Sequence, residues 1–144
     1  MFILFIKYHY TFRMKHIILT LFLSSLLLSA DLNWLHDYDK ALAEAKKEHK
    51  DVYLFIGADE CRFCDMFKKW TLSKKEVIDT LEKEYVLLYL SRDRHNIPKR
   101  FAIKGVPRHY FLTSSGEIIH EDMGSREPAG FYDILDEVDL KKDD

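Results

Sequence analysis

Two cysteines, Cys61 and Cys64, lie three positions apart in the stretch DECRFCDMF, and the chain has no others. Thiols at this spacing can open and close a disulfide when they lie one helical turn apart, because such side chains share a helix face. The pair could also be half of a metal site or a structural cross-link. Since the gain from loop closure grows with loop length, a bridge this short stabilises little. The spacing therefore favours redox chemistry.

The other functions of a cysteine pair each need residues that this chain supplies poorly. Covalent haem attachment requires a histidine after the second cysteine, and Asp65 occupies that position. A structural zinc site usually has four ligands, and no second C-x-x-C or paired-histidine motif completes one. The histidines beyond the first 30 residues form no recognisable triad with a cysteine, and we expect His109 to pack within a strand. We therefore expect no metal, while a purely structural pair stays open as an alternative.

Apolar patterns place the cysteine pair between a strand and a helix. The run DVYLFIG, residues 51–57, is continuous, rich in β-forming residues and closed by a glycine, as is typical of a strand covered on both faces. From Cys61 to Trp70 the pattern CRFCDMFKKW returns to helical spacing, and we expect Trp70 to pack in the core. The cysteines thus fall where a buried strand gives way to a helix.

The remaining patterns predict strands that alternate with helices. Ser73 and Glu76 form a capping-box pair, which predicts the start of a further helix, and Pro98 is expected to open a short helical stretch. The expected helices cover residues 37–49, 74–84, 97–103 and 129–140, and the expected further strands cover residues 85–91, 106–112 and 117–121. This order predicts an α/β fold with a parallel core and an antiparallel edge.

The first 30 residues have the features of a secretory signal peptide. Lys15 precedes an apolar run of about 12 residues, Ile17–Leu28, which is too short to cross a bilayer as a stable helix. We expect cleavage after Ala30, with Met14 as an alternative start, and one longer uncleaved membrane anchor as the other interpretation. Residues 31–144 would then be exported, into the periplasm where the cell has two membranes. No cysteine ends the apolar run, so no lipid anchor is expected.

Size and charge narrow the partners further. The 114 residues after the expected cleavage site suffice for one domain with a real core. The whole chain has 22 basic and 24 acidic residues, and removing three basic ones with the first 30 residues leaves a formal charge of −5. This charge argues against nucleic acid as a partner.

Three landmarks, in order over about residues 34–138, resemble the thioredoxin superfamily. The strand VYLFIG runs into the C-x-x-C pair at a helix start, FAIKGVPRHYFL is similar to the loop and strand that carry the family's cis-proline, and EIIHEDMG is similar to its last strand and glycine. The nearest subgroup is the exported thioredoxin-like proteins. The resemblance implies a thioredoxin fold, a central mixed sheet of about four strands flanked by helices on both faces, with a redox-active disulfide and no other cofactor.

The resemblance also implies roles for individual residues. Cys61 is the expected nucleophile, and Cys64 is the expected resolving cysteine. Pro107 is expected to follow a cis bond and to place the Val106 backbone beside Cys61, where it would pair with an extended substrate segment. Phe63 would add an apolar contact to substrate.

Charges around the first cysteine are expected to tune its reactivity. The helix end and Arg62 should stabilise the Cys61 thiolate, whereas Asp59, Glu60 and Asp65 oppose this. We expect a pKa of Cys61 below the ordinary value of about 8.5, but above the roughly 3.5 of the strongest oxidants. A less stabilised thiolate makes a less oxidising disulfide, which favours a reductase or isomerase.

The sequence departs from thioredoxin at several of these positions. Thioredoxin has an aromatic residue where Glu60 stands, Gly-Pro between its cysteines, and a buried aspartate at the position of Phe55. Its rate and potential therefore do not transfer. We expect partners that are exported proteins with thiols or disulfides, and an upstream membrane thiol–disulfide electron donor. The alternative is a noncatalytic thioredoxin-fold binding or assembly factor in the cell envelope.

Overall fold

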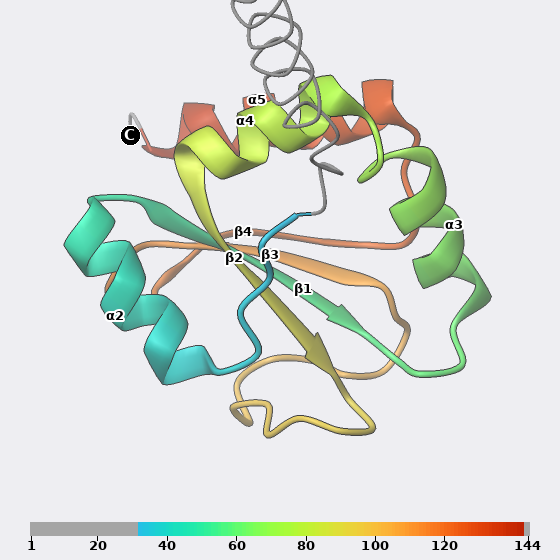
Figure 1. The fold of residues 1–144 in the computed structure, drawn as a ribbon, viewed down its shortest axis with the longest axis horizontal. Helices are drawn as coiled ribbons and strands as arrows, with labels where there is room; N and C mark the ends of the chain where they lie inside the picture. The colour runs from blue at the N-terminus through green and yellow to red at the C-terminus, as the bar shows by residue number, and fades with distance from the viewer. Residues whose placement is uncertain (1–31, 143–144) are drawn as a thin grey trace, which may run out of the picture. The chain divides into compact units, whose positions relative to one another are not determined.

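The computed structural model describes residues 32–142, so the expected signal peptide lies outside the described part (Figure 1). Four helices and four strands follow one another along the described chain: α2 (Tyr38–Glu48), β1 (Asp51–Gly57), α3 (Arg62–Trp70), α4 (Lys75–Glu84), β2 (Tyr85–Ser91), β3 (Arg108–Leu112), β4 (Ile118–Met123) and α5 (Pro128–Lys142). None of these helices combines the length and apolar character needed to cross a bilayer.

The strands form one mixed sheet in the order β2-β1-β3-β4. β1 pairs in parallel with β2, from Asp51 opposite Tyr85 to Gly57 opposite Ser91. β3 runs antiparallel to both β1 and β4. The predicted α/β class, with a parallel core and an antiparallel edge, is confirmed.

Helices cover both faces of this sheet, as Figure 1 shows for α2 on one side and α4 with α5 on the other. Successive side chains of a strand point to opposite faces, so β1 contributes to two cores. Tyr53 and Phe55 pack in a cluster that also contains Phe67 of α3 and Phe131 of α5. The alternate residues Val52, Leu54 and Ile56 pack in a second cluster with Ala41 and Ala45 of α2. The continuous apolar run in the sequence reflects burial on both faces.

Two predicted local features are wrong. The Ser73 hydroxyl donates to the Lys69 carbonyl at 2.5 Å instead of capping the next helix. Helix α4 begins at Lys75 after Lys74, which makes no side-chain capping bond. The predicted short helix at residues 97–103 is also absent from the structure. The Phe101 N–H donates to the Pro98 carbonyl at 3.0 Å, so the segment is a loop that contains a turn, and the buried Phe101 ring and a 3.0 Å bond from the Ala102 N–H to the Tyr110 hydroxyl hold it in place.

Candidate functional site

The two cysteines form a disulfide at the start of α3. Cys61 is the N-cap residue, and its Sγ accepts a hydrogen bond from the Cys64 N–H at 3.1 Å. Cys64 is fully buried, whereas Cys61 is 9% exposed. The buried end of β1 fixes the position from which α3 begins, so the outer sulfur lies against unsatisfied N–H groups of a helix terminus. A thiolate formed at Cys61 would be stabilised there.

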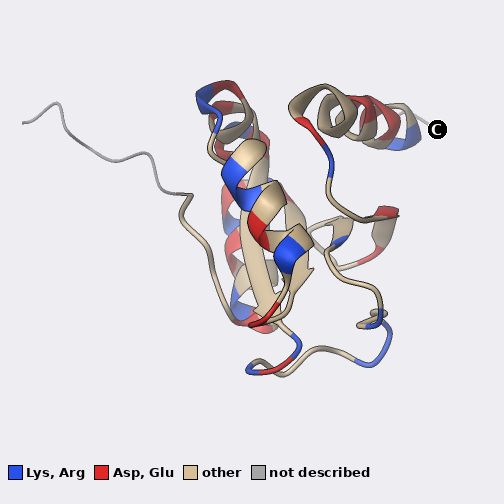
Figure 2. Ribbon diagram, turned by 90° about the vertical axis from the view of Figure 1, so that its right-hand side faces the viewer, with Lys and Arg blue, Asp and Glu red and all other residues tan. Residues whose placement is uncertain are grey.

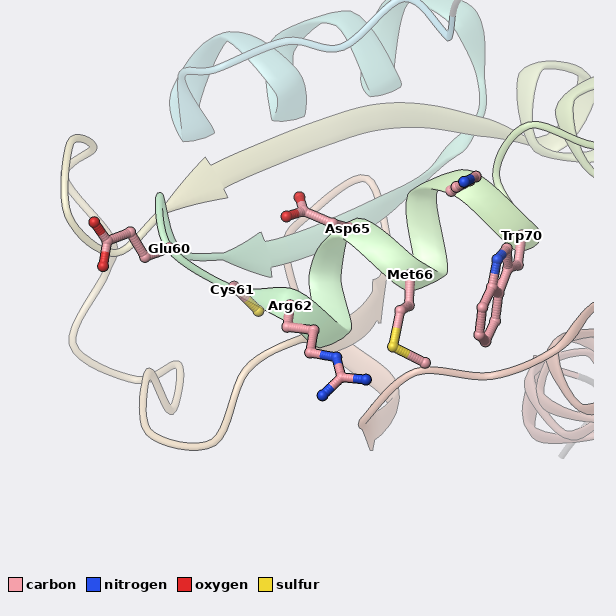
Figure 3. A pocket seen from close by; sticks show the side chains of 7 residues that line it. Glu60, Cys61, Arg62, Asp65, Met66 and Trp70 are labelled. Carbon is pink, nitrogen blue, oxygen red and sulfur yellow. The ribbon is translucent and has the colours of Figure 1, made fainter.

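Side chains beside Cys61 form a hollow of mixed charge (Figure 3). Arg62 and Lys69 line it together with Glu60 and Asp65. In Figure 3 the Glu60 carboxylate points away from Cys61. Neither Glu60 nor Asp65 forms an ion pair within residues 32–142, so no salt bridge neutralises these two carboxylates.

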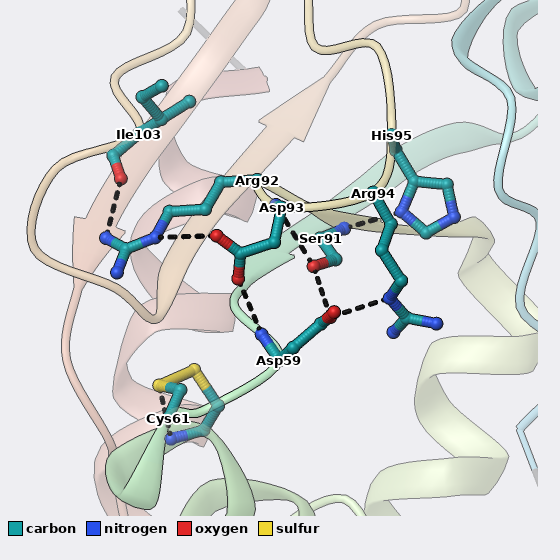
Figure 4. Close-up of polar contacts among 9 residues, drawn as sticks. Asp59, Cys61, Ser91, Arg92, Asp93, Arg94, His95 and Ile103 are labelled. Atoms are coloured by element: carbon teal, nitrogen blue, oxygen red, sulfur yellow. Dashed lines mark hydrogen bonds and ion pairs between the residues drawn. A yellow bond between two sulfur atoms is a disulfide. The ribbon is translucent and has the colours of Figure 1, made fainter.

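Unlike Glu60 and Asp65, Asp59 has its carboxylate bound by hydrogen bonds and an ion pair from residues that follow β2 or end it (Figure 4). Its Oδ1 accepts hydrogen bonds from the Ser91 hydroxyl at 2.7 Å and from Arg94 Nε at 2.6 Å. Its backbone N–H donates to Asp93 at 2.8 Å. The Ser91 hydrogen bond, together with Arg94, holds the pKa of Asp59 below its ordinary value. Arg94 therefore offsets the negative charge of Asp59, which would otherwise disfavour the Cys61 thiolate.

An open groove of about 520 Å³ runs from α3 to the loop before β3. The bond between Val106 and Pro107 is cis, as expected. Both residues line the groove together with Phe63, so the structure brings the three proposed substrate contacts to one place. The Pro107 carbonyl accepts from the Gly124 N–H at 2.9 Å, which joins this loop to the end of β4.

Three apolar residues of the groove were missed as site residues. Trp70, predicted to pack in the core, is 46% exposed and lines the groove with Met66. Met123, at the end of β4, is 49% exposed and lines the same groove. Met66 and Trp70 also line the hollow that contains Cys61, so the hollow and the groove share these two side chains. The helical spacing of Trp70 suggested burial, but α3 lies at the end of the sheet, where the core does not reach this side chain.

His109 is the buried polar residue behind the groove. Its Nδ1 lies 2.8 Å from the Tyr53 hydroxyl and its Nε2 lies 2.9 Å from the Gly124 carbonyl. A carbonyl only accepts, so Nε2 carries the proton and Nδ1 accepts from Tyr53. Burial lowers the pKa of His109 to about 4, so the ring is neutral at pH 7. The expected packing role is confirmed, and the ring also holds Gly124 in the wall of the groove.

The position of thioredoxin's buried aspartate is apolar. Phe55 is fully buried, and its ring stacks on His109 at 5.6 Å with an interplanar angle of 12°. Both nitrogens of His109 are already engaged by Tyr53 and Gly124. This part of the core therefore packs and orients the site.

Within the described residues, no three side chains of His, Cys, Asp or Glu gather as metal ligands would. The titratable and nucleophilic groups at the site are therefore the cysteine pair and its flanking charges. Such an arrangement can carry out thiol–disulfide exchange.

Comparisons with known proteins agree with this geometry. The sequence model of the Thioredoxin-like family matches residues 33–114. A thioredoxin structure from Thermus thermophilus has 28% sequence identity and a TM-score of 0.65, with 76% of this chain and 88% of that one covered. The oxidised DsbD C-terminal domain from Neisseria meningitidis has 24% identity and a TM-score of 0.60, with 72% and 97% covered, and supports the fold alone.

Curated relatives match over shorter parts of the chain. Anterior gradient protein 3 of Mus musculus is 24% identical over 87 residues, which are 59% of this chain and 52% of that protein. The chain thus spans about half the length of the curated relatives it matches. The family model covers more than half of the chain, and the fold and the C-x-x-C pair at the start of α3 agree with it. The chain belongs to the thioredoxin-like family.

Proposed function

We propose that the protein is an exported thiol–disulfide oxidoreductase that reduces or isomerises disulfides of exported proteins, in the periplasm where the cell has two membranes. The observation that carries the proposal is the difference between the two sulfurs. Cys61 reaches the surface at a helix N-terminus beside an apolar groove, whereas Cys64 is fully buried behind it. An incoming disulfide therefore meets Cys61 first.

The proposed reaction has two exchange steps. In the reduced protein the Cys61 thiolate attacks one sulfur of the substrate disulfide, that bond breaks, and the other substrate sulfur leaves as a thiolate. Cys64, as a thiolate, then attacks Sγ of Cys61 and releases the second substrate sulfur. Two electrons and two protons pass in total from the cysteine pair to the substrate. A membrane thiol–disulfide electron donor would reduce the pair again.

The groove would hold the substrate during these steps. Val106 and Pro107 present a loop edge to an extended segment, and Phe63, which is 57% exposed, offers an apolar contact. Glu60 and Asp65 offset the positive charges of Arg62 and Lys69 in the hollow around Cys61. The helix end is then the main group that stabilises the Cys61 thiolate, which favours a reducing or isomerising direction over a strongly oxidising one.

Reduction of insulin by the purified protein tests the proposal. Wild type should reduce insulin disulfides with a thiol reductant as electron source, and Cys61→Ser should be inactive. Cys64→Ser should retain the first step and accumulate a mixed disulfide on Cys61, seen as a mass increase that a thiol reductant removes. A folded wild-type protein that neither reduces insulin nor forms this adduct would support the noncatalytic binding factor instead.

A further inference from the structure

The loop between β2 and β3 has a positive net charge, whereas the net charge of the rest of the chain is negative. Residues 92–108, which are this loop and the first residue of β3, contain six basic side chains and one acidic side chain, a formal charge of +5. The whole chain has a formal charge of −2, so the remainder carries −7. Figure 2 shows Lys and Arg positions recurring along this loop. Such a local excess in a net acidic chain creates a positive potential at one place on the surface.

Part of this charge fastens the loop. Arg94 pairs with Asp59 at 2.6 Å. Arg92 donates to the Ile103 carbonyl at 3.3 Å and lies 3.8 Å from Asp93. These two arginines are thereby offset by carboxylates.

Four basic side chains of the loop have no carboxylate partner within residues 32–142. The four are Lys99, Arg100, Lys104 and Arg108. Arg100 donates to the Gly116 carbonyl and lies over the Phe101 ring at 4.8 Å, so its charge stays in place without being neutralised. The unpaired positive charge therefore belongs to the second half of the loop, which we call the basic loop, residues 99–108.

The basic loop borders the groove of the reactive site. Lys104 and Arg108 flank Gly105, Val106 and Pro107, which line the groove. Arg108 donates from both Nε and Nη2 to the Lys104 carbonyl, at 3.1 and 3.0 Å. These two hydrogen bonds to the backbone hold the guanidinium beside the groove. The Lys104 side chain is exposed. Arg108 therefore holds one positive charge beside the groove and the exposed Lys104 adds a second, and we call these two charges the positive rim.

Other charges near the groove do not cancel this rim. Glu127 is the acidic residue among those that line the groove. In the hollow around Cys61, Glu60 and Asp65 stand against Arg62 and Lys69, so the charges there balance. Phe63, Trp70 and Met123 are exposed apolar side chains that line the groove together with Gly105, Val106 and Pro107, and we call these three side chains the apolar wall. A matching segment would place an apolar side chain on this wall and a carboxylate toward the loop.

We propose that the basic loop selects disulfide substrates in which Asp or Glu residues flank the reacting cysteine. The proposal rests on the proposed function, and it adds the substrate class. Exposed charges act over about 10 Å at 0.1 M salt, which reaches a bound segment in the groove. Complementary charge acts mainly by raising the rate of association, so selection should appear in kcat/KM and weaken with salt.

Two disulfide peptides with the same cysteine core test this selection, one flanked by Asp and Glu and the other by Lys. The full-length protein should reduce the acidic peptide at least about fivefold faster in kcat/KM at low salt, and 0.3 M salt should remove most of the difference. The variant K99E/K104E should reverse the preference. The matched control K40E/K46E makes the same charge change on exposed positions of α2, and it should keep the wild-type preference.

Equal rates for the two peptides in wild type, or the same peptide preference in K99E/K104E and K40E/K46E, would overturn the role of the loop. Failure of wild type to reduce either peptide or insulin would contradict the proposed function instead. The two failures are therefore separate. All four lysines are exposed, so we expect the variants to fold. Circular dichroism of each variant checks this.

Discussion

Both ends of the central strand β1 are fastened by an ion pair, but the two pairs have different surroundings. At the start of β1, Asp51 pairs with Lys142 of α5 at 3.0 Å, and Lys142 also donates to the Tyr85 hydroxyl at 3.4 Å. Just past the other end, Asp59 pairs with Arg94 at 2.6 Å, two residues before Cys61. The first pair closes the C-terminal helix over the sheet. The second holds a loop whose neighbours are left open to a partner.

Three exposed apolar side chains gather at one of these two ends. Phe63, Trp70 and Met123 surround the groove at the cysteine end. A contiguous exposed apolar wall beside a reactive group is a feature of binding sites. An ion pair thus serves stability at the Asp51 end and positions a reactive loop at the Asp59 end.

The largest expected effect is a loss of stability at low pH that comes from His109, which packs behind the groove. Its pKa of about 4 lies below the ordinary value of 6.5 because of burial. Between pH 6.5 and 4 the imidazole of His109 binds a proton in the unfolded chain but not in the folded chain. The free energy of unfolding therefore falls as pH falls. The full loss is on the order of 3 kcal/mol. Urea unfolding at pH 7, 5.5 and 4 measures it.

A matched pair of variants isolates that effect. His109→Gln can still bond Tyr53 and Gly124 but cannot take a proton, so its loss of stability over this range should be smaller by most of that amount. His120→Gln, at the other buried histidine, which is 9% exposed, should keep most of the wild-type loss. An unchanged pH dependence in His109→Gln would show that other groups cause the acid sensitivity.

The next largest expected effect is on kcat/KM and comes from the apolar wall of the groove. Trp70→Ala should lower kcat/KM for a peptide disulfide by about tenfold, mainly through KM, because it removes binding area without touching the sulfurs. Leu140→Ala is the control, since Leu140 is 69% exposed on α5. Steady-state kinetics on both variants separates the two ends. A fall in kcat alone for Trp70→Ala would contradict a binding role.

Sequence patterns predicted the parts of the fold that rest on local spacing. The bounds of β1 and β2 match the prediction because a continuous apolar run is a direct imprint of burial on both faces. The cysteine pair is placed correctly at the junction of β1 and α3 for the same reason. The apolar face of α5, with Phe131, Ile134, Leu135 and Val138 buried, is also confirmed.

The features that escaped prediction depend on contacts between residues far apart in the chain. The bond between Asp59 and Arg94 spans 35 positions, so the sequence shows two charges but not that they meet. The shape of residues 97–103 depends on where Tyr110 places its hydroxyl. Trp70 has helical spacing typical of a core residue, and only the position of α3 at the end of the sheet exposes it. Spacing shows which residues share a face, whereas the fold decides what covers that face.

Lys142→Met tests the closed end of the sheet. Burial lowers the pKa of Lys142, but hydrogen bonding to Asp51, with Tyr85, raises it above its ordinary value overall. The substitution leaves Asp51 without this partner and should lower the free energy of unfolding by about 1 kcal/mol. Insulin reduction by the folded variant should not change. Loss of activity at unchanged stability would contradict the division between the two ends.

The smallest expected effect, on the reactivity of Cys61, comes from the Asp59 and Arg94 pair. Asp59→Asn leaves Arg94 positive and should favour the Cys61 thiolate, whereas Arg94→Gln leaves Asp59 negative and should disfavour it. The alkylation rate of the reduced protein by iodoacetamide near neutral pH should therefore rise in the first variant and fall in the second. Each change should be about two- to fivefold, because exposed charges are screened.

The double variant Asp59→Asn/Arg94→Gln separates charge from loop anchoring. If the pair acts through its charges, the two changes offset each other and the double variant should react at nearly the wild-type rate. If the pair acts by holding the loop before Cys61, both single variants and the double variant should react more slowly. Asp51→Asn is the control, since it removes the same charge at the closed end of β1 and should leave alkylation unchanged. Equal slowing in the three Asp59 and Arg94 variants would assign this pair to anchoring, as at the Asp51 end, and would remove the distinction between the two ion pairs.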